Sequence, residues 1–248
     1  MPIVIVSVIV QLALIVHALK TGRNTTWVFI LLFAPLIGSA AYVIVELLPE
    51  WTSSRGARSA RRNLVRVINP NRDVQAASNN LAVADTVQNA MALASEFLRK
   101  EKFAEAKELY QRSLRGIHED DPALLFGLAQ AQFGLGEFAG VVRSLDQLKE
   151  KNPSHTSPEG HLLYARALEN LGRSAEAIEE YESLCNYYPG PEPTCRLGMM
   201  LKASGEKDRA DQLFKRIVAE SKTAGRHYNT IHKEWVAIAK GGVAESIK

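Results

Sequence analysis

The apolar residues of this chain follow two patterns, which change near residue 50. Before that point, two nearly continuous apolar runs, residues 3–19 and 27–48, are joined by a short polar link that contains Gly22. A helix over the first run would be about 25 Å long, which is short but adequate for a bilayer, and the second run is longer. The pattern predicts a two-pass transmembrane helical hairpin over residues 1–50.

Beyond residue 86, small and large apolar residues recur at a regular spacing. Four segments align on Ala106, Val141, Ala177 and Ala210, in steps of 35, 36 and 33 residues, and a large apolar side chain follows each of them four residues later. An earlier helix in each unit carries an apolar or small pair at the same phase, and a loop glycine precedes three of the second helices. Because one helix pair cannot bury its own apolar face, the pattern predicts an all-α solenoid of four stacked helix pairs.

The period, the small residues, the loop glycines and the prolines Pro153 and Pro189 together resemble the tetratricopeptide repeat (TPR) family over residues 87–222. We expect a repeat domain over residues 81–248, with repeats at 87–120, 122–155, 158–191 and 191–224. In that family, the inner faces of the first helices line a concave groove that holds a peptide or helix of a protein partner.

The residues of this chain that match the inner faces of the first helices in the TPR family are a mixed set of apolar, polar and charged groove residues. Its basic members favour an acidic or carboxylate-bearing partner segment, whereas its apolar members supply contact area. For each residue, the alternative is that it packs between repeats. The predicted partner-binding residues are Met91, Arg99, Phe126, Gln130, Phe133, Arg166, Glu169, Asn170, Met199 and Lys202, together with Ser95 and Leu162.

The segment after the fourth unit mixes apolar and polar residues as an amphipathic helix does. We expect one capping helix over residues 226–240 that covers the end of the core, with Trp235 as its anchor. His227 and His232 are five residues apart and would lie on different faces of this helix, so they are predicted as surface residues. No metal or cofactor site is predicted.

Positive charge is concentrated in the linker, residues 51–80. This stretch carries a net charge of +5, whereas the whole chain carries +3. Next to an apolar run, such charge fits anionic lipid headgroups and marks the cytoplasmic side. Residues 57–68 would form a basic helix on the membrane surface, or the cluster would act as a topology signal alone. The residues concerned are Arg55, Arg58, Arg61, Arg62 and Arg66. Nucleic-acid binding is not expected.

The hairpin also resembles the hydrophobic N-terminal segment of bacterial cardiolipin synthases of the phospholipase D type. This resemblance implies a bacterial inner-membrane protein, but it brings no catalysis with it, because the HxKxxxxD motifs of that family do not occur in this sequence. It rests on the residues His17, Ala18, Leu19, Trp27, Pro35, Gly38 and Tyr42.

The side of the membrane on which the repeats lie determines whether the two cysteines are reduced thiols or can form a disulfide. Because a hairpin returns the chain to its starting side, the arginines place the repeats in the cytoplasm, where Cys185 and Cys195 would be reduced thiols. With the repeats in the periplasm instead, the two would be able to form a disulfide. No Lys or Arg precedes the first run, so a signal peptide is not expected.

The sequence contains no P-loop, no strand-linked dinucleotide fingerprint, no HExxH motif and no nucleophile elbow. It therefore predicts a membrane-anchored scaffold without catalytic residues, which recruits a protein through the repeat groove. The alternative is a non-catalytic accessory protein of cardiolipin metabolism that acts through its membrane hairpin. The sequence identifies neither the partner nor the oligomeric state.

Overall fold

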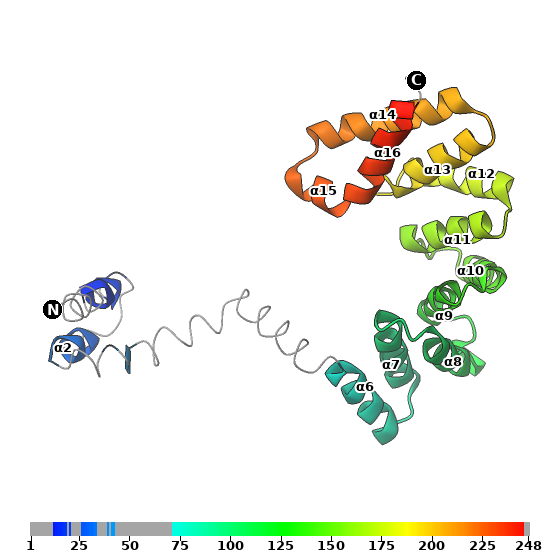
Figure 1. The fold of residues 1–248 in the computed structure, drawn as a ribbon. Coiled ribbons are helices and arrows are strands. Elements are labelled where there is room, and N and C mark those ends of the chain that lie inside the picture. Colours follow the sequence, from blue (N-terminus) through cyan, green and yellow to red (C-terminus); the bar gives the residue numbers. More distant parts are fainter. Residues whose placement is uncertain are drawn as a thin grey trace. The chain divides into compact units, whose positions relative to one another are not determined.

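The computed structural model describes residues 12–18, 20, 26–33, 39, 41–42 and 71–245. The chain divides into two compact units, Met1–Arg72 and Asp73–Lys248. In the second unit, every regular element is a helix (Figure 1). The predicted all-α class is therefore confirmed for this unit.

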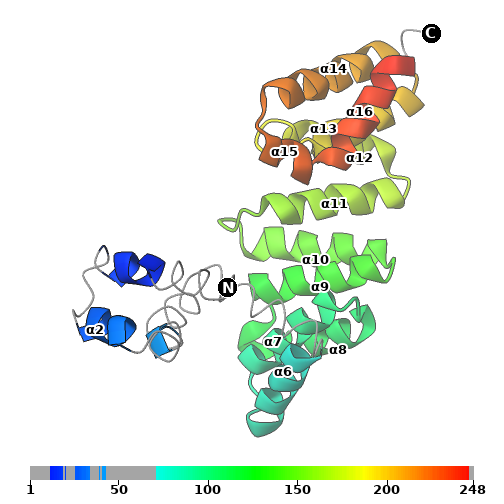
Figure 2. The ribbon, with the colours of Figure 1, turned by 60° about the vertical axis from the view of Figure 1, so that its left-hand side comes forward.

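Four helix pairs form the body of the second unit, and Figure 2 shows α9, α10 and α11 as successive layers. Each first helix packs on the second helix of its own pair, and from the second pair onward it also packs on that of the preceding pair. The stack confirms the TPR-like repeat array. The first helices are α7 (Val87–Arg99), α9 (Pro122–Gly134), α11 (Pro158–Asn170) and α13 (Glu192–Ala203), and the second helices are α8 (Phe103–Ser113), α10 (Phe138–Lys151), α12 (Ser174–Leu184) and α14 (Lys207–Thr223).

The four residues that define the sequence period lie in the core of the helix pairs. Ala106 and Ala177 are fully buried, and so are their counterparts in the other two pairs. The large residue one turn later packs against a first helix, and in two cases it faces a glycine there. A Cβ on Gly127 would lie 2.3 Å from the ring of Tyr110, and one on Gly198 would lie 2.8 Å from the ring of Phe214. The sequence period therefore reflects alternating small and large side chains in one continuous core.

Three of the first helices are preceded by an N-cap residue whose side chain accepts hydrogen bonds from backbone N–H groups of the first turn. Thr86, Asp121 and Ser157 are the N-caps of α7, α9 and α11. Pro122 and Pro158 follow two of these caps at the first helical position, where the missing N–H is not needed.

The turn inside each helix pair requires a left-handed backbone conformation. Gly136, Gly172 and Gly205 adopt it with φ of +74°, +72° and +94°. In the first pair, the same place is taken by Glu101, with φ of +57°. A residue with a Cβ is strained in this region, so the first turn is less favourable than the other three.

Replacing Glu101 by glycine is therefore expected to stabilise the first helix pair by about 1 kcal/mol. Chemical denaturation of the full chain, followed by helical circular dichroism, measures the effect. Glu101→Ala is the matched control, since it removes the same carboxylate but keeps the Cβ and should bring no comparable gain. Equal stability of the two variants would contradict the strain argument.

The C-terminal cap consists of two helices where the sequence predicts one. They are α15 (Arg226–Ile231) and α16 (Lys233–Glu245), which meet at His232. The break lets α16 lie against α14 (Figure 1), where Val236 and Ala239 are buried in the core. Trp235, the predicted anchor, is only partly buried and packs at the margin of this core.

One helix ahead of the repeats was not predicted. α6 (Arg72–Val83) begins well before residue 81, the predicted start of the repeat domain. Its single buried residue is Ala77. Polar contacts join it to α7: the Asn89 side-chain amide donates to the carbonyl of Asn80 at 3.1 Å.

In the first unit, the described helical segments are residues 12–18 and α2 (Thr26–Phe33). The Tyr42 hydroxyl lies 3.1 Å from Nδ1 of His17, and the Tyr42 ring packs edge-on against Trp27 at 5.4 Å. His17 thus has a tyrosine partner.

No helix in the described part of the chain is both long and apolar enough to cross a bilayer. Most of the predicted spans, 3–19 and 27–48, lies outside the described residues. So do the predicted surface helix, residues 57–68, and the predicted lipid-contacting residues Arg55, Arg58, Arg61, Arg62 and Arg66. The hairpin and its basic linker therefore stay predictions.

Candidate functional site

The predicted groove residues lie on the four first helices, and we call the surface they share the first-helix face. At its α7 end, Arg99 is already engaged: its guanidinium pairs with Glu96 and lies 3.4 Å from Asp73 of α6. Met91 on the same helix packs into a small core cluster formed by α7, α8 and α9. These two residues therefore connect elements of the fold.

The apolar members of the first-helix face also contribute to packing. Phe126, Phe133 and Met199 are partly buried against the main core. Gln130 on α9 is exposed, as is Asn170 on α11, whose amide donates to the carbonyl of Arg166 at 2.7 Å. Lys202 on α13 is half-buried.

A group of charged side chains joins α11 to α13 on this face. The Arg196 guanidinium donates to Glu192 at 2.8 Å and to Glu169 at 3.1 Å, and it lies over the Trp235 ring at 4.9 Å. Glu169 also accepts the Tyr181 hydroxyl at 2.6 Å. Glu169, a predicted partner-binding residue, is thus tied into the fold.

Burial, and then the neighbouring carboxylate of Glu169, raise the pKa of the Tyr181 hydroxyl well above its usual range. The hydroxyl therefore stays protonated and keeps donating to Glu169 throughout the physiological range. Sequence reasoning missed Glu192 and Arg196, although their spacing of four residues on one helix is a signal for an ion pair.

Arg166 differs from these residues because its donors are largely unused. Its guanidinium lies over the Phe133 ring at 4.7 Å, and its Nε is 3.8 Å from a Glu192 oxygen, too far for a hydrogen bond. This Nε is shielded from solvent and has no hydrogen-bond partner among the described residues. A third of the side chain remains exposed, at 33 %. A planar cation held in this way suits a carboxylate, which accepts two parallel hydrogen bonds from a guanidinium.

The cysteines and histidines form no comparable site. Cys185 and Cys195 are free thiols, and the Thr194 hydroxyl donates to the Cys185 sulfur at 3.3 Å. Burial raises the pKa of Cys185 and raises that of Cys195 to about 11, so neither is an activated nucleophile. Within the described ranges, no three potential metal ligands gather.

Comparison with solved structures shows the same fold at low identity. A crystal structure of MamA is 16 % identical with a TM-score of 0.56, and covers 68 % of this chain and 96 % of its own. TTC0263, a thermophilic TPR protein in Thermus thermophilus, is 14 % identical with a TM-score of 0.52, over 74 % of this chain and 96 % of its own. A tetratricopeptide repeat protein from Parabacteroides merdae is 16 % identical with a TM-score of 0.50, over 93 % and 91 %.

No curated protein matches the chain. None of the comparisons supports a likeness of the first residues to the cardiolipin synthase segment. One family model, described as the N-terminal domain of the ESX-1 secretion system protein EccA1 of type VII secretion, matches residues 61–230. This match spans most of the chain and nearly all of the repeat array, and on it the chain belongs to the family of EccA1 N-terminal domains.

Proposed function

We propose that this chain is a non-catalytic adaptor that binds an acidic segment of a protein partner on its first-helix face, with Arg166 as the residue that receives a carboxylate. A TPR-like fold implies protein partners. The observation that supports the site is the geometry of Arg166: its guanidinium lies over the Phe133 ring, its Nε lacks a hydrogen-bond partner among the described residues, and a third of the side chain is exposed to a partner. Beside it, Glu169 and Arg196 are bonded to each other, and Glu169 also accepts the Tyr181 hydroxyl.

We further propose that residues 1–50 anchor the adaptor in a bacterial inner membrane, with the repeats on the cytoplasmic face. The two apolar runs and the arginines of the linker, residues 51–80, support this arrangement. Family membership favours a partner that belongs to a protein-secretion machinery, since the family takes its name from a type VII secretion protein. No observation favours the alternative role in cardiolipin metabolism.

Site-specific crosslinking in cells tests the assignment of the acidic segment. A photoreactive amino acid at Gln130, which is exposed on α9 three residues before Phe133, should crosslink to a partner peptide rich in Asp or Glu. Arg166→Gln should lower the yield about tenfold, because it removes a charge-assisted bidentate contact. Arg143→Gln, on the exposed side of α10, is the matched control and should leave the yield unchanged.

Two results would refute the proposal. One is an equal yield from the wild type and the Arg166→Gln variant, and the other is a crosslinked peptide without acidic residues. Circular dichroism of the variant shows whether the fold is intact, so a loss of crosslinking cannot be mistaken for unfolding.

A further inference from the structure

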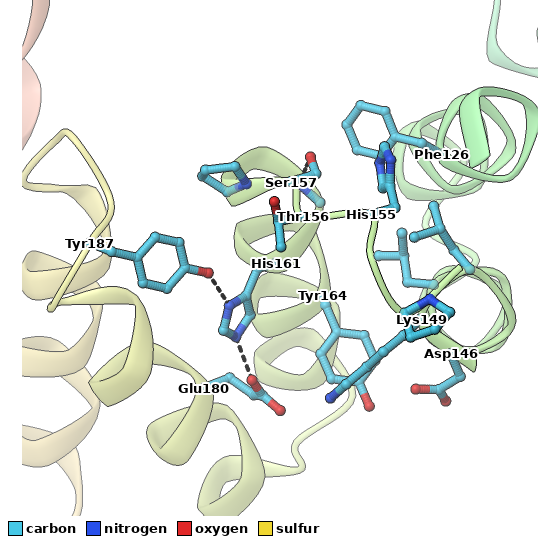
Figure 3. A pocket seen from close by; sticks show the side chains of 15 residues that line it. Phe126, Asp146, Lys149, His155, Thr156, Ser157, His161, Tyr164, Glu180 and Tyr187 are labelled. Atoms are coloured by element: carbon cyan, nitrogen blue, oxygen red, sulfur yellow. Dashed lines mark hydrogen bonds and ion pairs between the residues drawn. The ribbon is translucent and has the colours of Figure 1, made fainter. Parts of the chain in front are cut away.

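A cavity of about 610 Å³ lies beside the first half of α11, apart from the charged cluster around Arg166. Figure 3 shows its walls. On α11, the lining residues are Gly160, His161 and Tyr164, whereas the first-helix face uses Arg166 and Glu169, which the helical period places on another side. A volume of this size falls within the range of about 300–1,000 Å³ that is typical of ligand pockets.

One wall of the cavity is apolar. Phe126 of α9 and Leu145 and Leu148 of α10 line it, together with Pro153 and Pro158 at the two ends of the loop between α10 and α11. Phe126 was predicted as a groove residue. In the structure, it lies within van der Waals distance of α11, 3.7 Å from where a Cβ on Gly160 would be. This wall suits an aliphatic or aromatic group rather than a fully hydrated ion.

Two carboxylates line the cavity from different helices: Asp146 from α10, which also carries Leu145 and Leu148, and Glu180 from α12 (Figure 3). In Figure 3, the His161 ring lies between Glu180 and Tyr187, and hydrogen bonds join its two nitrogens to the Glu180 carboxylate and the Tyr187 hydroxyl. The charge of Asp146 acts on the hydroxyl of Tyr164, which also lines the cavity. A carboxylate has about four acceptor positions, so both groups keep acceptors for a ligand.

The electrostatic field around the Tyr164 hydroxyl is negative. Burial, followed by the charges of Asp146 and Glu180, raises the pKa of the Tyr164 hydroxyl to about 12. Arg173 opposes this effect, but its guanidinium is bonded to Glu176. Among the residues that line the cavity, Lys149 is the single lysine or arginine, and it is not among the groups that act on the Tyr164 hydroxyl. The floor around Tyr164 is therefore acidic.

We propose that this cavity binds a lysine or arginine side chain of a protein partner, with the aliphatic stem along Phe126 and Leu145 and the cationic group between Asp146 and Glu180. An anionic group there would meet two carboxylates and one lysine. A purely apolar group would separate the carboxylates from water without giving them a donor, which costs free energy. A basic side chain avoids both costs, because its apolar stem packs on the apolar wall and its cationic end pairs with the carboxylates.

The proposal goes beyond the binding of an acidic segment at Arg166, since its charged residues are different ones and bind the opposite charge, while Phe126 belongs both to the first-helix face and to the cavity wall. A partner segment that carries both acidic and basic residues would engage both sites. The two proposals also fail separately, because different variants and different probes test them.

A pair of small probes tests the cavity directly. The full chain, labelled at its leucine methyl groups, is titrated with acetyl-Leu-Arg-methylamide, and the methyl signals of Leu145 and Leu148 are followed by NMR. These signals should shift and saturate. The matched probe, acetyl-Leu-citrulline-methylamide, has the same shape without the charge and should bind about tenfold more weakly. Equal binding of the two probes would overturn the role of the carboxylates.

Conservative variants test the two carboxylates. Asp146→Asn and Glu180→Gln together should weaken binding of the arginine probe by about tenfold or more, while the methyl spectrum of the free protein stays that of a folded chain. Glu150→Gln and Glu179→Gln remove the same charges from exposed neighbours outside the cavity and should leave affinity unchanged. Two outcomes would refute the proposal: no saturable shift at Leu145 and Leu148, or stronger binding of acetyl-Leu-Glu-methylamide than of the arginine probe.

Discussion

Replacing Phe214 by alanine is expected to lower the free energy of unfolding of the last helix pair by about 3–5 kcal/mol. The ring is only 2 % exposed and fills the space between three helices. Its atoms come so close to Gly198 of α13 and Gly242 of α16 that a Cβ on either glycine would lie 2.8 or 2.5 Å from the ring. Because the backbones are spaced to fit this ring, truncation leaves a cavity that they cannot easily close.

Denaturation of the full chain measures the loss, and hydrogen exchange locates it. Amides of α13, α14 and α16 should exchange much faster in the variant, whereas those of α7 and α8 should change little, since stability in repeat stacks is largely local. Lys215→Ala, at the exposed neighbouring position, is the control and should lie within about 0.5 kcal/mol of the wild type. A loss below about 1 kcal/mol for Phe214→Ala would show that the end of the stack repacks.

Replacing Arg196 by methionine is expected to cost about 3 kcal/mol, since it leaves two carboxylates largely shielded from water without their main cation. The Arg196 side chain is 16 % exposed, and Glu192 and Glu169 are 18 % and 28 % exposed. Methionine keeps most of the packing volume over Trp235, so the loss reports on charge more than on shape. Chemical denaturation gives the change in free energy.

Neutralising the carboxylates should restore much of this loss. The variant with Arg196→Met, Glu169→Gln and Glu192→Gln is expected to recover at least half of the stability lost by Arg196→Met alone, because no unpaired charge remains. Arg209→Met, which breaks ion pairs with Glu182 and Glu206 on the exposed surface, should have a far smaller effect. If the triple variant is less stable than Arg196→Met, the network is held by its hydrogen bonds rather than by charge balance.

The repeat array could be predicted from the sequence because its core is periodic. Each residue from Ala106 to Ala210 that fixed the period is fully buried, and the first helices begin at residues 87, 122, 158 and 192. The elements that the sequence did not predict are those that depart from the repeat period. α6 buries only Ala77, and the turn at Glu101 lacks the glycine that marks the other turns.

The interaction surface could be predicted only in outline. The repeat pattern places Arg166 and Glu169 on one face of α11, but pairing depends on which side chains the next repeat brings within reach. Arg196 donates to Glu169 at 3.1 Å. The only acidic contact of Arg166 among the described residues is with Glu192, at 3.8 Å from its Nε. The cavity was beyond sequence reasoning for a similar reason, since Asp146, His161 and Tyr187 belong to different helices and loops that only packing brings together.

The way α16 lies on α14 also limits where this array can gain a repeat. A repeat added after Thr223 would need the surface of α14 that α16 already covers, and it would leave Val236 and Ala239 without a core. A repeat inserted between α10 and α11 would meet helix surfaces of the kind found at every other junction. A longer version of this array is therefore expected to gain its repeats by internal duplication, with the C-terminal helices carried along at the end.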